Sequence, residues 1–177
     1  LVLLCLLLLC CGVAAAGDEV TAMTITVDAD SNAVCRVTVS AELDCGTSPT
    51  RIVFPLHSDA RSISATGGDY KKQTIDGVKC VVFRSDAGFS GRQSFTCSYT
   101  LPSSAAEQAD GQLFSLDLIE KGWDYPIRKL DLTLNFPTEI TVQPSWNSSY
   151  YGDVIDNFLR ISIQGTTITA SATTFLK

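Results

Sequence analysis

The sequence predicts an all-β protein: a two-sheet antiparallel β-sandwich of immunoglobulin-like arrangement with about eleven strands. Apolar and polar residues alternate with a period of two through most of the chain after residue 17. Turn-forming residues separate these runs every ~8–12 residues, and no convincing 12-residue helical period interrupts them. Strands with one apolar and one polar face fit two sheets that each meet solvent on one side.

The first half of the chain supplies most of these strands. Residues 23–29 and 35–43 alternate cleanly on either side of the turn at 30–32. Residues 52–56 form a short strand whose Pro55 is typical of a sheet edge or a bulge. Residues 70–75 and 78–84 flank Asp76-Gly77, the strongest hairpin signal in the sequence.

The second half continues the alternation after one interruption. A strand is predicted at 95–101, and the polar stretch Pro102 to Gln112 is predicted to be a long surface loop with at most one helical turn at 105–108. The cleanest strand follows at 129–136, with Leu130, Leu132, Leu134 and Phe136 facing inward. Residues 159–163 are expected to pair with 168–172 across Gly165-Thr166.

The N-terminus indicates export. Leu1 to Leu9 is apolar throughout, and Ala14 to Ala16 supplies small residues for a cleavage site. We therefore expect residues 1–16 to be a signal peptide and residues 17–177 to be a single extracytoplasmic domain. The apolar stretch is short of the ~20 residues that span a membrane. The chain starts without Met, so an uncleaved anchor stays open as an alternative.

Composition excludes some partners. The formal net charge is −6 and the pI is near 4.6. Nucleic acids and anionic lipid surfaces recruit clusters of Lys and Arg, whereas here the cationic residues are scattered, and Lys71-Lys72 and Arg128-Lys129 are the adjacent pairs. The sequence predicts no cofactor and no nucleic acid partner, and it leaves a cell-surface protein or a glycan open.

Four cysteines remain after the leader: Cys35, Cys45, Cys80 and Cys97. An even number in an exported domain favours disulfides; free buried thiols and a zinc site are the alternatives. Cys35 and Cys45 bracket one predicted strand, about 33 Å apart at ~3.3 Å per residue, so a link between them is disfavoured. The immunoglobulin-like winding favours Cys35–Cys97 and Cys45–Cys80.

Two residue sets are weighed as functional sites. Five aromatic residues gather in the C-terminal part, where exposed rings could stack on sugars: Trp123, Tyr125, Trp146, Tyr150 and Tyr151. Closure of the ends of the core by the two tryptophans is the favoured alternative. His57, the only histidine, could act as a general base, but no nucleophile is marked near it, and a solvated loop histidine is the expected reading.

One segment resembles a known family. Residues 122–127 (GWDYPI) lead into the alternating strand 129–136 and Pro137. This step, with the strand at 95–101 and a leader followed by a hairpin, is similar to the bacterial predicted-membrane-protein family of unknown function (domain of unknown function twenty-two-oh-seven). The chain is identified as a divergent member, since Arg51 to Leu56 departs from the usual family segment. The resemblance implies an extracytoplasmic β-domain tethered by transmembrane helices C-terminal to it, and it implies no catalytic residues.

Three functions are therefore carried forward. The favoured one is a non-catalytic domain with a structural or interaction role on the extracellular face of the cell membrane. A carbohydrate-binding module using the C-terminal aromatics is the first alternative. A secreted hydrolase is the second alternative, and it would need converging carboxylates or a base beside a nucleophile.

Overall fold

The structure is a computed structural model, and it describes residues 17–102, 105–108, 111–114, 116, 119, 122–141, 149–150, 153–154 and 159–173. Fourteen β-strands make up the regular structure of these ranges, so the all-β class is confirmed, with more strands than the eleven predicted. The strands are β1 (Glu19–Ala29), β2 (Cys35–Cys45), β3 (Arg51–Leu56), β4 (Arg61–Thr66), β5 (Tyr70–Ile75), β6 (Val78–Arg84), β7 (Gly91–Leu101), β8 (Ala105–Gln108), β9 (Gly111–Phe114), β10 (Leu130–Asn135), β11 (Ser149–Tyr150), β12 (Asp153–Val154), β13 (Arg160–Gln164) and β14 (Thr167–Ala172).

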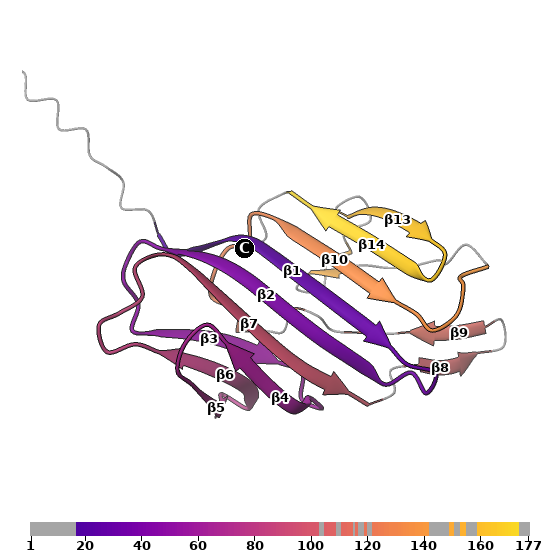
Figure 1. Cartoon of the computed structure of the whole chain (residues 1–177), viewed down its shortest axis with the longest axis horizontal. Helices are drawn as coiled ribbons and strands as arrows, with labels where there is room; N and C mark the ends of the chain where they lie inside the picture. Colours follow the sequence, from indigo (N-terminus) through magenta and orange to yellow (C-terminus); the bar gives the residue numbers. More distant parts are fainter. Residues whose placement is uncertain are drawn as a thin grey trace, which may run out of the picture.

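Seven strands form one broad sheet in the order β13-β14-β10-β1-β2-β7-β4 (Figure 1). Its neighbours are antiparallel except β1 and β10, which run parallel with Met23 opposite Leu130 and Asp28 opposite Asn135. The large sheet is therefore mixed, and the prediction of antiparallel sheets is wrong at this pair. Alternation fixes which face of a strand is buried, but it says nothing about the direction of its neighbour.

Three strands form a second, antiparallel sheet in the order β3-β6-β5. Pro55 lies in its edge strand β3, where a missing N–H is tolerated, as predicted. The β5–β6 hairpin turns at Asp76 and Gly77, whose φ angles are 50° and 84°. Two positive φ values in a two-residue loop match the twist of the flanking strands, so this hairpin is confirmed.

The polar stretch after β7 is not only a loop. Strands β8 and β9 pair within it, with Ala105 opposite Phe114 and Gln108 opposite Gly111. The helical turn considered for residues 105–108 is wrong, because those residues form β8. No apolar alternation marks this hairpin, so the period-two signal on which the prediction rested does not register it.

The small sheet packs against part of the large one through a shared core. Inward residues of β1, β2 and β7 lie in one apolar cluster with those of β3 and β6. Phe95 of β7 joins the two sheets: its ring centroid lies 4.5 Å from that of Phe83 and 6.1 Å from that of Phe54. Phe54 and Phe83 belong to β3 and β6. The burial of these three rings contributes to the contact between the layers.

β2 begins at Cys35 and ends at Cys45, as predicted for the strand that these two cysteines bracket. β2 and β7 are neighbours in the same sheet, with Val39 opposite Cys97. The predicted immunoglobulin-like winding placed these strands in facing sheets, and that prediction is wrong. Cys35 lies four residues along β2 from Val39, about 13 Å at ~3.3 Å per residue. A disulfide needs Cα atoms within ~7 Å, so the structure does not support Cys35–Cys97.

Cys45, Cys80 and Cys97 are buried free thiols. The second predicted link, Cys45–Cys80, is therefore also not formed. Burial raises the pKa of Cys97 to about 12. It also raises the pKa of Cys45 to about 11, with help from the Asp18 and Asp44 carboxylates, and that of Cys80. A thiol held neutral in this way is a poor nucleophile and oxidises slowly.

The predicted strand at 129–136 is β10, which lies between β1 and β14 inside the large sheet. Leu132 is buried, whereas Thr133 points to the other face and is partly exposed. We expect Leu132→Ala to lower the free energy of unfolding by about 2–5 kcal/mol through lost burial and a residual cavity. Thr133→Ala should change it by less than about 0.5 kcal/mol. Urea denaturation of both variants beside the parent measures the difference; equal losses would mean that both faces of β10 are packed.

Cys97 makes the stability of the fold sensitive to alkaline pH. Its pKa is about 12 in the folded chain, against an ordinary value of 9.0. The unfolded chain releases this proton more readily, so stability is intact below pH 9 and falls as the pH rises toward 12. At pH 10 this one thiol should lower the free energy of unfolding by roughly 1 kcal/mol.

Urea denaturation of the parent and of Cys97→Ala at neutral pH and at pH 10 tests this. The substitution removes the titrating thiol, so the drop in stability between the two pH values should be smaller in the variant. An equal drop in both proteins would show that Cys97 is not responsible.

Candidate functional site

Trp123 and Tyr125, the two predicted ligand-facing aromatics with described side chains, lie at one end of the shared core. The indole of Trp123 meets Phe54 edge to face, with centroids 4.9 Å apart and planes at 90°. Tyr125 meets Trp123 in the same manner, at 5.9 Å and 75°. Both side chains are half-buried and pack on the core cluster. Rings at right angles form no flat platform for a sugar, so this geometry fits closure of the core.

The polar atoms of the two rings differ in their surroundings. The Tyr125 hydroxyl donates a long hydrogen bond of 3.5 Å to the backbone oxygen of Arg51. Burial, followed by the nearby carboxylates of Asp18 and Asp124, raises the pKa of Tyr125 to about 12. The Nε1 atom of Trp123 is buried, with no hydrogen-bond partner among the residues that the structure describes. Neither group is presented as a ligand-binding donor.

The remaining predicted aromatics are Trp146, Tyr150 and Tyr151. Trp146 and Tyr151 lie outside the described residues. Tyr150 belongs to β11, where its backbone pairs with Asp153, and only that backbone is described. A sugar-binding role for these three stays a prediction.

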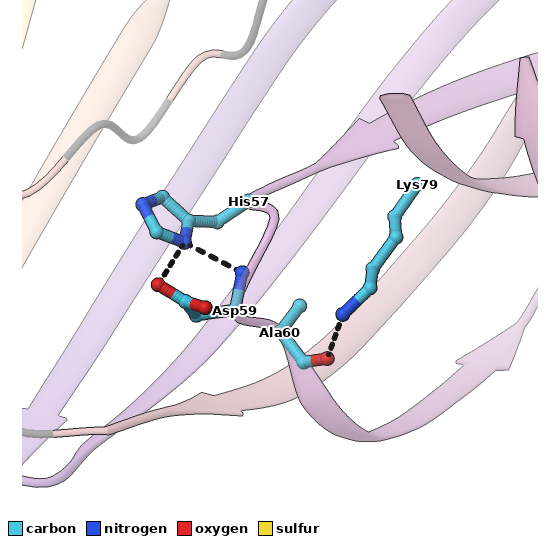
Figure 2. Close-up of polar contacts among 4 residues, drawn as sticks. All are labelled: His57, Asp59, Ala60 and Lys79. Atoms are coloured by element: carbon cyan, nitrogen blue, oxygen red, sulfur yellow. Dashed lines mark hydrogen bonds and ion pairs between the residues drawn. The ribbon is translucent and has the colours of Figure 1, made fainter. Parts of the chain in front are cut away.

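His57 begins the turn by which the chain leaves β3 in the small sheet and enters β4 in the large one (Figure 2). Its Nδ1 accepts a hydrogen bond of 3.1 Å from the Asp59 N–H and lies 3.9 Å from an Asp59 carboxylate oxygen. The backbone closes the same turn, because Ala60 N–H donates to the His57 oxygen at 2.9 Å. Nδ1 is thus used to shape its own loop, as the loop interpretation of this histidine predicted.

Sequence reasoning missed a group of cations beyond this turn. Lys79 of β6 donates a hydrogen bond of 3.2 Å from Nζ to the Ala60 oxygen (Figure 2). Arg61 of β4, Lys72 of β5 and Lys79 line one open cavity. The available signal was positional: Lys72 and Lys79 occupy core-facing places in the alternation of the Asp76-Gly77 hairpin. The approach of Arg61 depends on β4, a strand that the sequence did not predict.

Within the described ranges, no three side chains of His, Cys, Asp or Glu gather closely enough to hold a metal ion. In the same ranges, no helix is long and apolar enough to cross a membrane.

Comparisons of the fold find distant likenesses. The structure of yeast LTA4 hydrolase in complex with bestatin matches with a TM-score of 0.52 and 8% sequence identity, over 89% of this chain and 29% of that one. Native leukotriene A4 hydrolase from Saccharomyces cerevisiae matches with a TM-score of 0.50 at 8% identity, over 88% and 29%. The chain thus spans under a third of these proteins, and at such identity the likeness concerns the fold alone.

A comparison of the sequence is more specific. No curated protein matches the chain. The family described as "Predicted membrane protein (DUF2207) N-terminal domain" matches residues 19–174. The match begins at the first residue of β1 and extends past the end of β14, so it covers the whole described fold and confirms the resemblance seen at residues 122–137. This chain belongs to the DUF2207 family of predicted membrane proteins.

Proposed function

We propose that this chain is the extracytoplasmic, non-catalytic domain of a membrane-tethered bacterial surface protein, with a role in interaction or structural support. The observation that carries the proposal is the family match over residues 19–174, whose description combines a membrane protein with an N-terminal domain. An N-terminal β-domain is consistent with a membrane tether that lies C-terminal to it in the full-length protein. The apolar leader at residues 1–16, read as a signal peptide, supports export.

The chemistry of the described side chains supports a role without catalysis. A cysteine nucleophile needs a depressed pKa, whereas Cys45, Cys80 and Cys97 all have raised values. The Nδ1 atom of His57 is engaged by its own loop.

The proposed topology can be tested with one introduced thiol in the full-length protein. Ser162 is exposed on β13, an edge strand of the large sheet. Intact cells carrying Ser162→Cys should be labelled by a membrane-impermeant maleimide, because the new thiol faces the outside. The parent protein is the matched control, and its buried thiols should react far more slowly.

The tether is tested in the same cells. The labelled protein should stay in the membrane fraction after a high-salt and an alkaline carbonate wash. Labelling that appears only after the cells are permeabilised would contradict the extracytoplasmic position. Release of the protein by the washes would contradict the tether.

A further inference from the structure

Three cationic side chains from three strands line one open cavity between the two sheets. The cavity measures about 450 Å³ and lies where β4, the edge of the large sheet, approaches β5 and β6 of the small sheet. Arg61, Lys72 and Lys79 supply the charges. The rest of the lining is neutral: Ala60, Ser62, Ile63, Gln73, Thr74 and Cys80.

The strand register explains why the two lysines face this space. Lys72 is opposite Val81, and Val81 lies in the core cluster. Lys79 is two residues from Val81 and therefore shares its face of β6. The core-facing side of the β5–β6 hairpin thus changes from apolar to cationic toward its turn. The Lys79 ammonium is fixed across the cavity by its bond to the Ala60 oxygen.

A bulge brings the third charge and its neighbours to the same place. The pairing of β4 with β7 shifts register between Arg61 and Ser64, and Ser62 has a φ of 51°. Arg61, Ser62 and Ile63, the residues at this irregularity, all line the cavity. β-bulges re-aim side chains in this manner beside functional sites.

The charge of the cavity is unbalanced. The whole chain carries a formal net charge of −6, yet none of the described residues that line this space carries a carboxylate. The ion pairs among the described residues involve other cations and none of these three. Three like charges around one space repel one another, and a bound anion with more than one negative charge would remove that repulsion.

We propose that the cationic seam, defined by Arg61, Lys72 and Lys79, binds a phosphate-bearing ligand. Arginine offers a fork of N–H donors and lysine a compact charge, and both suit phosphate oxygens. Ser62 and Thr74 belong to the same lining, and each carries a hydroxyl group that can donate to a phosphate oxygen. The volume falls in the range of small-ligand sites, ~300–1,000 Å³.

This inference names a ligand for the interaction role proposed above. It rests on the proposed function only for the location of the ligand, which would be outside the cell. The binding measurement is made in solution on the purified protein. If pyrophosphate does not bind, the maleimide labelling of Ser162→Cys still tests the extracytoplasmic position. If that labelling requires permeabilised cells, the binding measurement still tests the ligand.

Isothermal titration of the purified full chain with pyrophosphate at low ionic strength tests the seam. We expect saturable binding that weakens as salt is added, and a loss of about fivefold in affinity in Lys72→Gln. The matched control is Lys71→Gln, which removes the same charge from the neighbouring, exposed residue outside the cavity lining. It should bind as the parent does.

Two outcomes would overturn the proposal. One is the absence of saturable binding in the parent. The other is an equal loss of affinity in Lys71→Gln and Lys72→Gln, which would reduce the effect to general charge. In either case, the three cations of the seam would serve to prevent strands of other chains from pairing with the edge strands β4 and β5.

The source of the phosphate is decided by a second measurement. Sedimentation with vesicles of phosphatidylcholine, with and without phosphatidylglycerol, tests a lipid headgroup. Binding to the phosphatidylglycerol vesicles that is lost in Lys72→Gln assigns the ligand to the membrane surface. Pyrophosphate binding without vesicle binding assigns a soluble phosphate compound.

Discussion

The position of Phe95 between the two sheets is the constraint on which the rest of the structure depends. Its ring contacts Phe83 and Phe54 of the small sheet and, at 5.3 Å, Phe89 from the loop before β7. Gly67 shows how close the neighbouring chain must come: a Cβ there would lie 2.4 Å from the Ser94 oxygen and 2.9 Å from the Phe95 Cα. With a φ of 116°, this position requires glycine for both space and conformation.

The space between the two sheets has a different composition on either side of the aromatic cluster around Phe95. Toward Trp123 the aromatic packing continues, because that indole meets Phe54 edge to face. Toward the Asp76-Gly77 turn the apolar residues stop at Val81, and lysines take their places. One end is closed by rings that meet edge to face, and the other is an open cavity with positive charge. The two ends therefore offer different chemistry.

Local pattern predicted much of the fold. The strands β1, β2, β7 and β10 were evident because each buries one face, and the turn at Asp76-Gly77 was evident because its residues accept positive φ. The residues 105–108 carry no alternation, so their pairing in β8 was missed. The parallel neighbour of β1 was also missed, since sequence alternation contains no information on strand direction.

The candidate sites were harder to predict because they depend on which strands become neighbours. The cysteine pairing failed for that reason: β2 and β7 were expected in facing sheets, and they pair within one. Lys72 and Lys79 stood in a correctly predicted hairpin, but their significance arises only when Arg61 approaches from another sheet. The available signal was a charged residue at a position where the alternation predicts an apolar one. Functional sites are expected at such local inconsistencies.

The parallel pairing of β1 with β10 has a consequence for how the chain acquires its structure. β1 can pair with β2 and β2 with β7 once residue 101 has been made, but the other edge of β1 has no neighbour until residues 126–135 arrive. At the usual pace of synthesis this delay is about 2–6 s. During that time a long strand keeps a row of unpaired backbone groups, a ready template for another chain. The free edge of β1 is therefore a place where the nascent protein can associate wrongly before its sheet is complete.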